Sequence, residues 1–311
     1  MTQTTNPKIS AVVCTRNRGD RVAATINSLL ANTHPSFEVI LIDQSPNQET
    51  ELAVQQFLHD PRFNYHHTTS VGTGVSRNLG VQIARGTVVA FTDDDCTVPT
   101  NWLETMATIF DQHPRVAVVF CNVEAVIYDT SKGFVPTYLR KSDEIVRTLR
   151  QKCKARGIGA GMAVRREAVM AYGNFDTLLG PGTRFPDCED GDIAVRALLN
   201  NWWIYETAQV TVTHDGFRTW KQGKELSQRN WIGIGAAYSK PIKCRKWKFL
   251  IVVLYEAFAV ALWAPLSLIW RFKKPVGLRR FFYFWKGFFQ GMRAPIDCHY
   301  IRFIPTKPDG N

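Results

Sequence analysis

The sequence lacks any CxxC pair and any cluster of cysteines and histidines at zinc-binding spacing. Its 7 cysteines are therefore not expected to build a structural zinc site. Most of them, Cys14, Cys96, Cys121 and Cys188, lie in or beside apolar runs, where a cysteine behaves as a small buried hydrophobe. This usage favours a reducing compartment such as the cytoplasm.

Internal repeats and low-complexity tracts are also absent. Residues 1–7 are polar and are expected to be disordered, and because Met1 to Lys8 contains no apolar stretch, we expect no secretory signal. The 311 residues are 45% hydrophobic and 21% charged, which is ordinary for a folded chain with one large core or two smaller ones.

Acidic residues are scarce in one part of the chain only. Residues 243–311 contain 13 Lys and Arg against 3 Asp and Glu, a net charge of +10, which leaves +1 of the total +11 for residues 1–242. The sequence therefore predicts a nearly neutral domain over residues 8–242 and a separate basic tail over residues 243–311.

The first ninety residues alternate between apolar runs and helix-like segments. Predicted strands cover residues 9–15, 37–42, 62–65 and 87–91, and predicted helices cover 20–31, 50–58 and 75–84. Short connections between alternating elements are typical of a doubly wound, mostly parallel α/β sheet.

Polar residues follow three of these strands. Thr15, Asp43 and the triplet Asp93-Asp94-Asp95 all stand where a parallel strand ends, which is the edge of the sheet where ligands bind. Because three adjacent carboxylates repel one another, we expect a divalent cation, bridged to a diphosphate, to offset their charge. The alternative is an acidic cap for the helix that begins near Trp102.

The second half of the domain is expected to contain further strands and a long connection. We predict strands over residues 116–123 and 210–213, a mobile loop over 126–154, and a glycine-rich segment over 157–161. A helix over residues 185–199 opens with Glu189, Asp190 and Asp192, and the last strand ends at His214.

Together these motifs resemble the family 2 glycosyltransferases. The resemblance covers roughly residues 8–220 and departs from the usual pattern at Gln44, where the family often has a second acid. The matching stretches, in chain order, are residues 12–17, residues 41–45, Gly74 with Arg77, Asn78 and Gly80, Asp93 to Asp95, Glu189 with Asp190 and Asp192, and His214 with Arg218.

The resemblance implies a GT-A fold with a nucleotide-binding half at about 8–98 and an acceptor half at about 99–242. It implies inverting transfer from a nucleotide-diphospho-sugar, with Asp95 as the direct metal ligand and His214 completing the metal shell. The metal would be Mn²⁺ or Mg²⁺, and imidazole suits Mn²⁺ better. Asp190 is the predicted general base, although a role in capping its helix is the alternative.

Further contacts follow from the same resemblance. The predicted nucleotide-sugar-binding residues are Thr15, Asn17, Asp43, Arg77, Asp93 and Asp94, and the possible acceptor or phosphate contacts are Glu189, Gly161 and Arg218. Arg77 and Asn78 are equally well explained as anchors of the loop before them. Residues 228–231 only approximate the QxxRW motif of processive synthases, so we expect single transfer.

Two other functions are alternatives to sugar transfer. A nucleotidyltransferase also uses acidic metal ligands, but the first strand is not followed by the basic, glycine-rich signature it would need. A non-catalytic nucleotide-sugar-binding scaffold would not need to keep the acids that the motifs retain.

The tail combines apolar, aromatic and basic residues. Residues 249–270 are mostly apolar, apart from Glu256 and Pro265, and would reach roughly 33 Å as a helix. Basic clusters stand at both ends, and residues 278–292 mix aromatics with Arg and Lys. We expect a hairpin or re-entrant segment on an anionic membrane at its cytoplasmic face, with a carbohydrate or lipid-linked acceptor and no nucleic acid. A single span and a soluble cytoplasmic chain with a buried tail are the alternatives.

Overall fold

The computed structural model describes residues 6–268 and 277–306, and it centres on one mixed sheet. Four parallel strands form the first half in the order β3-β2-β1-β4, where β1 is Ile9–Thr15, β2 Phe37–Asp43, β3 Phe63–His67 and β4 Val88–Asp93. Thr15 pairs with Asp43, and Cys14 pairs with Asp93. The polar strand ends therefore share one edge, as the sequence predicts.

The second half of the sheet contains both strand directions. The order continues β9-β6-β10-β5, where β9 is Met162–Arg165, β6 Val116–Ala125, β10 Trp203–His214 and β5 Cys96–Thr97. β9 runs antiparallel between β4 and β6, whereas β6 and β10 are parallel. The prediction of a mostly parallel α/β sheet is confirmed, and β9, β5 and a short strand that pairs with β10 are the antiparallel additions.

Two segments differ from their predicted form. Strand β10 begins at Trp203 instead of residue 210, because it continues through a bulge between Glu206 and Thr211. Asp143 stabilises this bulge by accepting hydrogen bonds from the Ala208 N–H at 2.7 Å and the Tyr205 hydroxyl at 2.8 Å. The predicted loop at 126–154 contains β7 (Gly133–Phe134), β8 (Glu144–Val146), which pairs with β10, and the 3₁₀ helix η2 (Leu149–Lys154).

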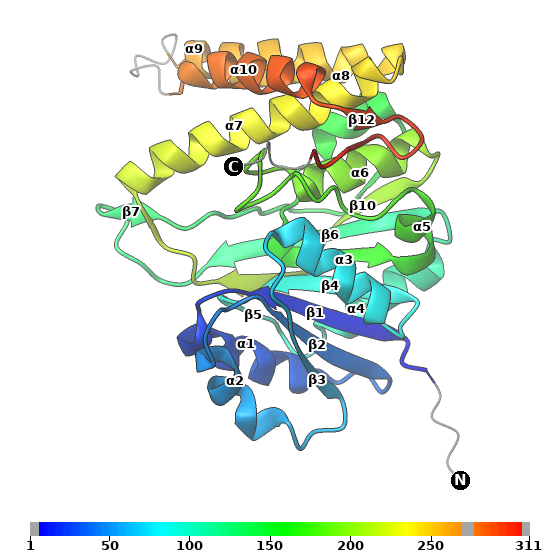
Figure 1. The fold of residues 1–311 in the computed structure, drawn as a ribbon, viewed down its shortest axis with the longest axis vertical. Helices are drawn as coiled ribbons and strands as arrows, with labels where there is room; N and C mark the ends of the chain where they lie inside the picture. Colours follow the sequence, from blue (N-terminus) through cyan, green and yellow to red (C-terminus); the bar gives the residue numbers. More distant parts are fainter. Residues whose placement is uncertain (1–5, 269–276, 307–311) are drawn as a thin grey trace.

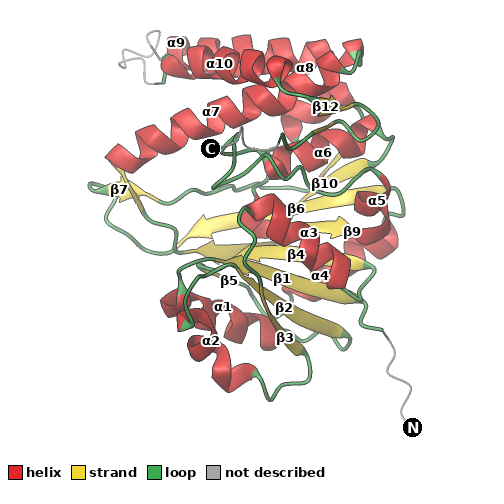
Figure 2. Cartoon of the chain, viewed as in Figure 1, coloured by secondary structure: helices red, strands yellow, loops and turns green. Residues whose placement is uncertain are grey.

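Helices cover both faces of the sheet (Figure 2). On one face, α1 (Gly19–Leu30) and α4 (Trp102–Gln112) bury apolar side chains with alternate strand residues, and Trp102 is fully buried there. On the other, α3 (Thr73–Ile83), α5 (Arg166–Ala171) and α6 (Glu189–Leu199) pack over the remaining strand residues. The short helix α2 (Glu49–Val54) lies beside α1. This two-faced burial explains why the strands read as continuous apolar runs.

The C-terminal part forms a helical layer along one side of the sheet domain (Figure 1). Helix α7 (Trp220–Lys243) crosses toward it, and α10 (Arg279–Arg293) packs on α7 so closely that a Cβ atom at Gly235 or Gly287 would overlap backbone of the other helix. The helical segment Trp247–Ser267 lies beside α10. It comprises η4 (Trp247–Phe249), α8 (Leu250–Leu254), the π-helix η5 (Tyr255–Trp263) and α9 (Ala264–Ser267).

Among the described residues, Trp247–Ser267 is the one helical segment whose length and composition would allow it to cross a membrane, with 21 residues and an 18-residue stretch of mean hydropathy 2.1. A core helix of a soluble protein meets the same criteria, so this is weak evidence by itself. The basic cluster of Arg271, Lys273 and Lys274 predicted to flank it lies outside the described residues, as do residues 1–5.

A disulfide joins Cys244, just after α7, to Cys298 in the hairpin formed by β12 (Ile296–Asp297) and β13 (Arg302–Phe303). The cysteine pattern gave no indication of this bond. Cys96, Cys121 and Cys188 are buried as predicted, and Cys14 is partly exposed.

Candidate active site

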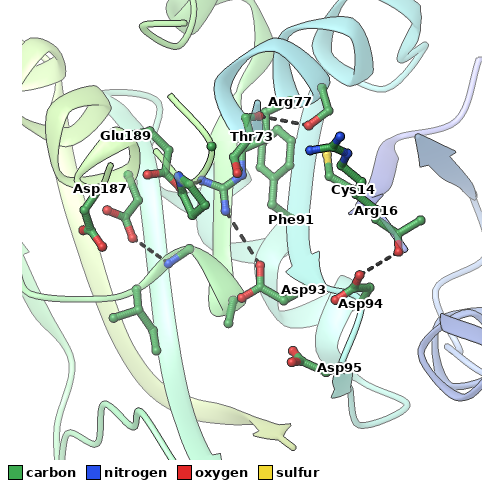
Figure 3. Close-up of a pocket in the computed structure, with 18 of the residues that line it drawn as sticks. Cys14, Arg16, Thr73, Arg77, Phe91, Asp93, Asp94, Asp95, Asp187 and Glu189 are labelled. Carbon is green, nitrogen blue, oxygen red and sulfur yellow. Dashed lines mark hydrogen bonds and ion pairs between the residues drawn. The ribbon is translucent and has the colours of Figure 1, made fainter. Parts of the chain in front are cut away.

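A cavity of about 520 Å³ lies at the carboxyl edge of the parallel strands. Its walls come from the ends of β1 and β4, the start of α3, residues 158–160, the start of α6 and the N-terminal half of α7. In Figure 3, Asp93, Asp94 and Asp95 line one part of the cavity, and Asp187 and Glu189 line another. The fold therefore collects two groups of carboxylates around one space.

Asp94 and Asp95 are held by Thr15, the last residue of β1, and by Arg18, which follows it. The Thr15 hydroxyl donates to Asp94 Oδ2 at 2.6 Å, and one Arg18 nitrogen contacts Asp94 Oδ1 at 2.8 Å and Asp95 Oδ2 at 3.0 Å. Burial raises the pKa of Asp94, although Arg18 opposes this. Burial also acts to raise the pKa of Asp95, but the adjacent His214 imidazole and Arg18 outweigh it and hold that pKa below its usual range.

A cation would fit between Asp93, Asp95 and His214. Ligand atoms of these residues and of Cys96 all lie within 4.8 Å of one another. The His214 ring contacts the Pro136 carbonyl oxygen through Nδ1 at 3.1 Å, so with the proton there its Nε2 lone pair points toward Asp95 Oδ1 at 3.3 Å. Asp95 Oδ1 is buried, and this ring nitrogen is its close polar neighbour. A divalent cation bound between the two groups would satisfy both the ring nitrogen and the carboxylate oxygen in place of a proton.

Arg77 connects the two carboxylate groups. Its guanidinium is buried and lies 3.0 Å from Glu189 Oε1 and 3.8 Å from Asp93 Oδ1. Burial raises the pKa of Glu189 to about 7, against the opposing charge of Arg77. Asn78 faces elsewhere, because its amide exchanges hydrogen bonds with the backbone of Phe175, and it therefore serves as a loop anchor.

Asp190 stands in the first turn of α6 with its carboxylate held by two backbone amides. The Gly159 N–H donates to Oδ2 at 2.8 Å, and the Gly191 N–H donates to Oδ1 at 2.6 Å. Both carboxylate oxygens keep further lone pairs for a ligand in the cavity. The neighbouring Asp187 differs, because burial and the charges of Glu189 and Asp190 raise its pKa well above the usual range.

Three residues predicted for the site do not line the cavity. Asp43 is fully buried, and its oxygens accept from the Ser45 N–H at 2.8 Å and the Tyr65 hydroxyl at 2.9 Å. Asn17 is exposed in a turn with φ 58°, and Gly161 is buried against Cys121. The residues that do line it are Thr15, Arg77, Asp93, Asp94, Asp95, Glu189, Asp190, His214 and Arg218.

Several residues of the cavity wall are not among those predicted from the sequence. Arg18 contacts two of the three acids although it lies just beyond the first motif, and Gln44 lines the cavity beside the buried Asp43. Leu226, Arg229 and Asn230 reach the cavity from α7. Their only signal in the sequence is the approximate QxxRW motif at residues 228–231, which lies on this helix.

Comparison with known proteins identifies the family to which the chain belongs. The family model for glycosyl transferase family 2 matches residues 10–173. A glucosyl-dolichyl phosphate glucuronosyltransferase from Haloferax volcanii is 24% identical over 196 residues, which cover 61% of this chain. This chain spans 63% of the length of that relative.

Solved structures share the fold at low sequence identity. The mannosyltransferase PcManGT from Pyrobaculum calidifontis, in complex with GDP-Man and Mn²⁺, has a TM-score of 0.62 at 16% identity, covering 93% of this chain and 88% of its own. S. aureus TarS 1–349, in complex with UDP-GlcNAc, has a TM-score of 0.60 at 18% identity, covering 92% and 81%.

These likenesses confirm the predicted GT-A fold. The family match extends over more than half of the chain and contains the strands and acids that form one wall of the cavity. The chain therefore belongs to glycosyl transferase family 2.

Proposed function

We propose that this glycosyltransferase transfers a sugar, with inversion, from a nucleotide-diphospho-sugar to an acceptor hydroxyl. The donor we favour is a UDP-sugar. The observation that carries this proposal is that one cavity holds both a cation-binding set, Asp93, Asp95 and His214, and a separate carboxylate, Asp190, presented by backbone amides.

The cation-binding set lies where the donor diphosphate would be held. Asp95 and His214 would bind Mn²⁺ or Mg²⁺, with Asp93 on the metal or the ribose. When bound, the metal would neutralise the charge that develops on the leaving diphosphate. Thr15 and Arg18 orient the carboxylates of Asp94 and Asp95 through the hydrogen bonds described above. Gln44 lines the same cavity and would be available to the nucleotide.

Asp190 would act as the general base. As the acceptor oxygen bonds to the anomeric carbon, the bond from that carbon to the diphosphate breaks, and the nucleoside diphosphate leaves with the electron pair. The acceptor proton passes to Asp190, whose orientation depends on the Gly159 N–H. Attack opposite the leaving group inverts the anomeric centre in a single step.

The relatives support the donor class more strongly than they support a particular acceptor. TarS and PcManGT were solved with UDP-GlcNAc and with GDP-Man and Mn²⁺, respectively, so nucleotide-sugar donors occur on this fold. The H. volcanii relative is named for a glucosyl-dolichyl phosphate. A lipid-linked or polysaccharide hydroxyl is the acceptor class we propose here.

Asp95→Asn tests the donor and metal site directly. Across a panel of UDP-, GDP- and dTDP-sugars, we expect one donor to be hydrolysed in Mn²⁺ or Mg²⁺ and not in EDTA. In the Asp95→Asn variant, the rate of donor hydrolysis should fall on the order of 100-fold, because an amide contributes no negative charge to the metal site. Metal-independent release, or a variant as active as the wild type, would contradict the proposal.

The tail is proposed to lie in the plane of the cytoplasmic membrane surface. The segment Trp247–Ser267 packs one side on the domain through Phe249, Val252, Val253, Ala257 and Ala261, which are buried. Its other side leaves large apolar side chains exposed: Trp247, Leu250, Ile251, Leu254, Tyr255, Phe258 and Trp263. A segment docked along its length on its own domain is poorly placed to span a bilayer, whereas its outer face suits insertion beside anionic headgroups.

Phe258→Asp is expected to weaken binding to vesicles containing phosphatidylglycerol by about tenfold, because a phenylalanine side chain no longer enters the lipid. The control is Leu58→Asp, since Leu58 is 48% exposed and Phe258 is 47% exposed but Leu58 lies beside α2, far from the tail. Co-sedimentation with vesicles at low and high salt measures the binding of both variants and of the wild type. Equal losses in the two variants, or complete release of the wild type by salt alone, would refute apolar insertion.

A further inference from the structure

Glu256 is an unusual residue for its surroundings. It lies in the π-helical part of the apolar Trp247–Ser267 segment, and the side chain is only 4% exposed. A carboxylate buried among apolar groups is costly unless a cation and hydrogen bonds compensate it. Its presence there calls for a specific partner.

Arg156 is that partner. Its two terminal nitrogens contact the two Glu256 oxygens at 3.1 and 3.3 Å, and its Nε donates to the Cys153 carbonyl oxygen at 3.1 Å. A two-pronged arginine–carboxylate pair fixes orientation as well as distance. The pair therefore holds the backbone at residue 156 in a defined place relative to the tail.

The chain runs from Arg156 to the active site in three residues. The Gly157 N–H donates to Glu206 Oε1 at 3.0 Å, and the Gly159 N–H donates to Asp190 Oδ2 at 2.8 Å. The path is narrow, because a Cβ atom at Gly157 would overlap the Phe120 ring and one at Gly159 would overlap the Arg77 guanidinium. A shift at residue 156 therefore has little room to be absorbed before Gly159.

We propose that Arg156 is a positioning residue for the transfer reaction, which acts by anchoring residues 156–159 to Glu256 of the tail so that the Gly159 N–H holds the Asp190 carboxylate toward the acceptor. This inference rests on the proposed role of Asp190 as general base. It assigns the tail a function in turnover besides membrane binding, because the membrane-facing segment supplies the carboxylate that anchors the loop.

The experiment compares Arg156→Gln, Glu256→Gln and the double variant in the full chain. We expect each single variant to lower kcat by about tenfold, with the donor KM changed by less than about twofold, since a misplaced base affects the transition state and not donor binding. The double variant should lose no more than either single variant, because both remove one interaction.

Lys154→Gln is the matched control. Lys154 lies in the same segment and pairs with Glu144 at 2.9 Å, but its side chain is 50% exposed and the pair does not involve the tail. We expect this variant to keep the kcat of the wild type. The charge-reversed variant, Arg156→Glu with Glu256→Arg, should recover part of the lost kcat.

Hydrogen exchange separates this inference from the proposed function. Amides of a peptide covering residues 155–162 should exchange faster in Arg156→Gln than in Lys154→Gln, whether or not a substrate is known. Faster exchange without any transferase activity in the wild type would refute the proposed function and keep the anchor. Unchanged exchange, additive losses in the double variant, or a kcat within about twofold of the wild type would overturn the anchor.

Discussion

Asp190→Asn is expected to lower the kcat of sugar transfer on the order of 1,000-fold, because the amide cannot accept the acceptor proton. The side chains have nearly the same size, and Asn keeps one oxygen to accept from the Gly159 or Gly191 N–H. The change is therefore electrostatic and local. Steady-state kinetics with the donor identified by the hydrolysis panel measure kcat. Calorimetry measures the affinity for the nucleoside diphosphate and the metal.

Nucleotide binding should stay within about threefold of the wild type, since Asp190 belongs to the α6 side of the cavity and not to the cation-binding set. Asp187→Asn provides the comparison. Burial and neighbouring acids raise the pKa of Asp187 well above its usual range, which disfavours the ionised form that a general base needs. The Asp187→Asn variant should therefore lose less than about tenfold in kcat. Near-normal turnover in Asp190→Asn, or an equal loss in Asp187→Asn, would show that the base is another group.

The parallel half of the fold could be predicted because its signals are local. Buried parallel strands read as apolar runs, and each run here ends in a polar residue whose position along the chain defines the sheet edge. Thr15 and Asp93 to Asp95 therefore appear together in the cavity, as expected. The same reasoning places Asp43 at the edge, but it gives no indication that Ser45 and Tyr65 occupy both of its oxygens.

The remaining features depend on pairs that are distant in the sequence. Arg18 meets Asp94, and Arg156 meets Glu256 a hundred residues later, and no local pattern in the sequence identifies either partner. Strand β9 enters between β4 and β6 in the antiparallel direction, although its apolar residues resemble those of the parallel strands. Register and partner choice of this kind come from packing across the whole domain, so they required the structure.

Helix α7 is the clearest case of a long-range role. Its N-terminal half lines the cavity, and its C-terminal half is buried between the sheet domain and α10. Near that end, Lys240 is fully buried, with its Nζ 2.6 Å from Asp176 Oδ2 and 2.8 Å from Asp192 Oδ1. Asp176 Oδ2 also accepts from the Phe303 N–H of the C-terminal hairpin at 2.8 Å. Lys240, on α7, thus links helix α6 to Asp176, which in turn contacts the C-terminal hairpin.

Lys240→Met should lower the free energy of unfolding at pH 7 by about 3–5 kcal/mol, because it leaves the buried Asp176 carboxylate without its cation, whereas Asp192 keeps Arg196 at 2.8 Å. Burial acts to raise the pKa of Asp176, but Lys240 outweighs it and holds that pKa below its usual range. In the wild type, this contribution is therefore present at neutral pH and is lost only as the pH falls through that lowered pKa. In the variant, burial is opposed only by the N–H groups of Leu178 and Phe303, so we expect the pKa of Asp176 to rise and the stability of the folded state to increase as the pH falls.

The difference between Lys240→Met and the wild type should therefore be smaller at pH 5 than at pH 7, which denaturant unfolding at both values measures. Lys221→Met controls for the substitution itself, because Lys221 is exposed on the same helix. The double variant Lys240→Met with Asp176→Asn should recover part of the loss, since the amide oxygen still accepts from the Phe303 N–H and carries no charge. A loss below about 1 kcal/mol, or one that grows as the pH falls, would mean that the buried cation does not hold α6 and the tail together.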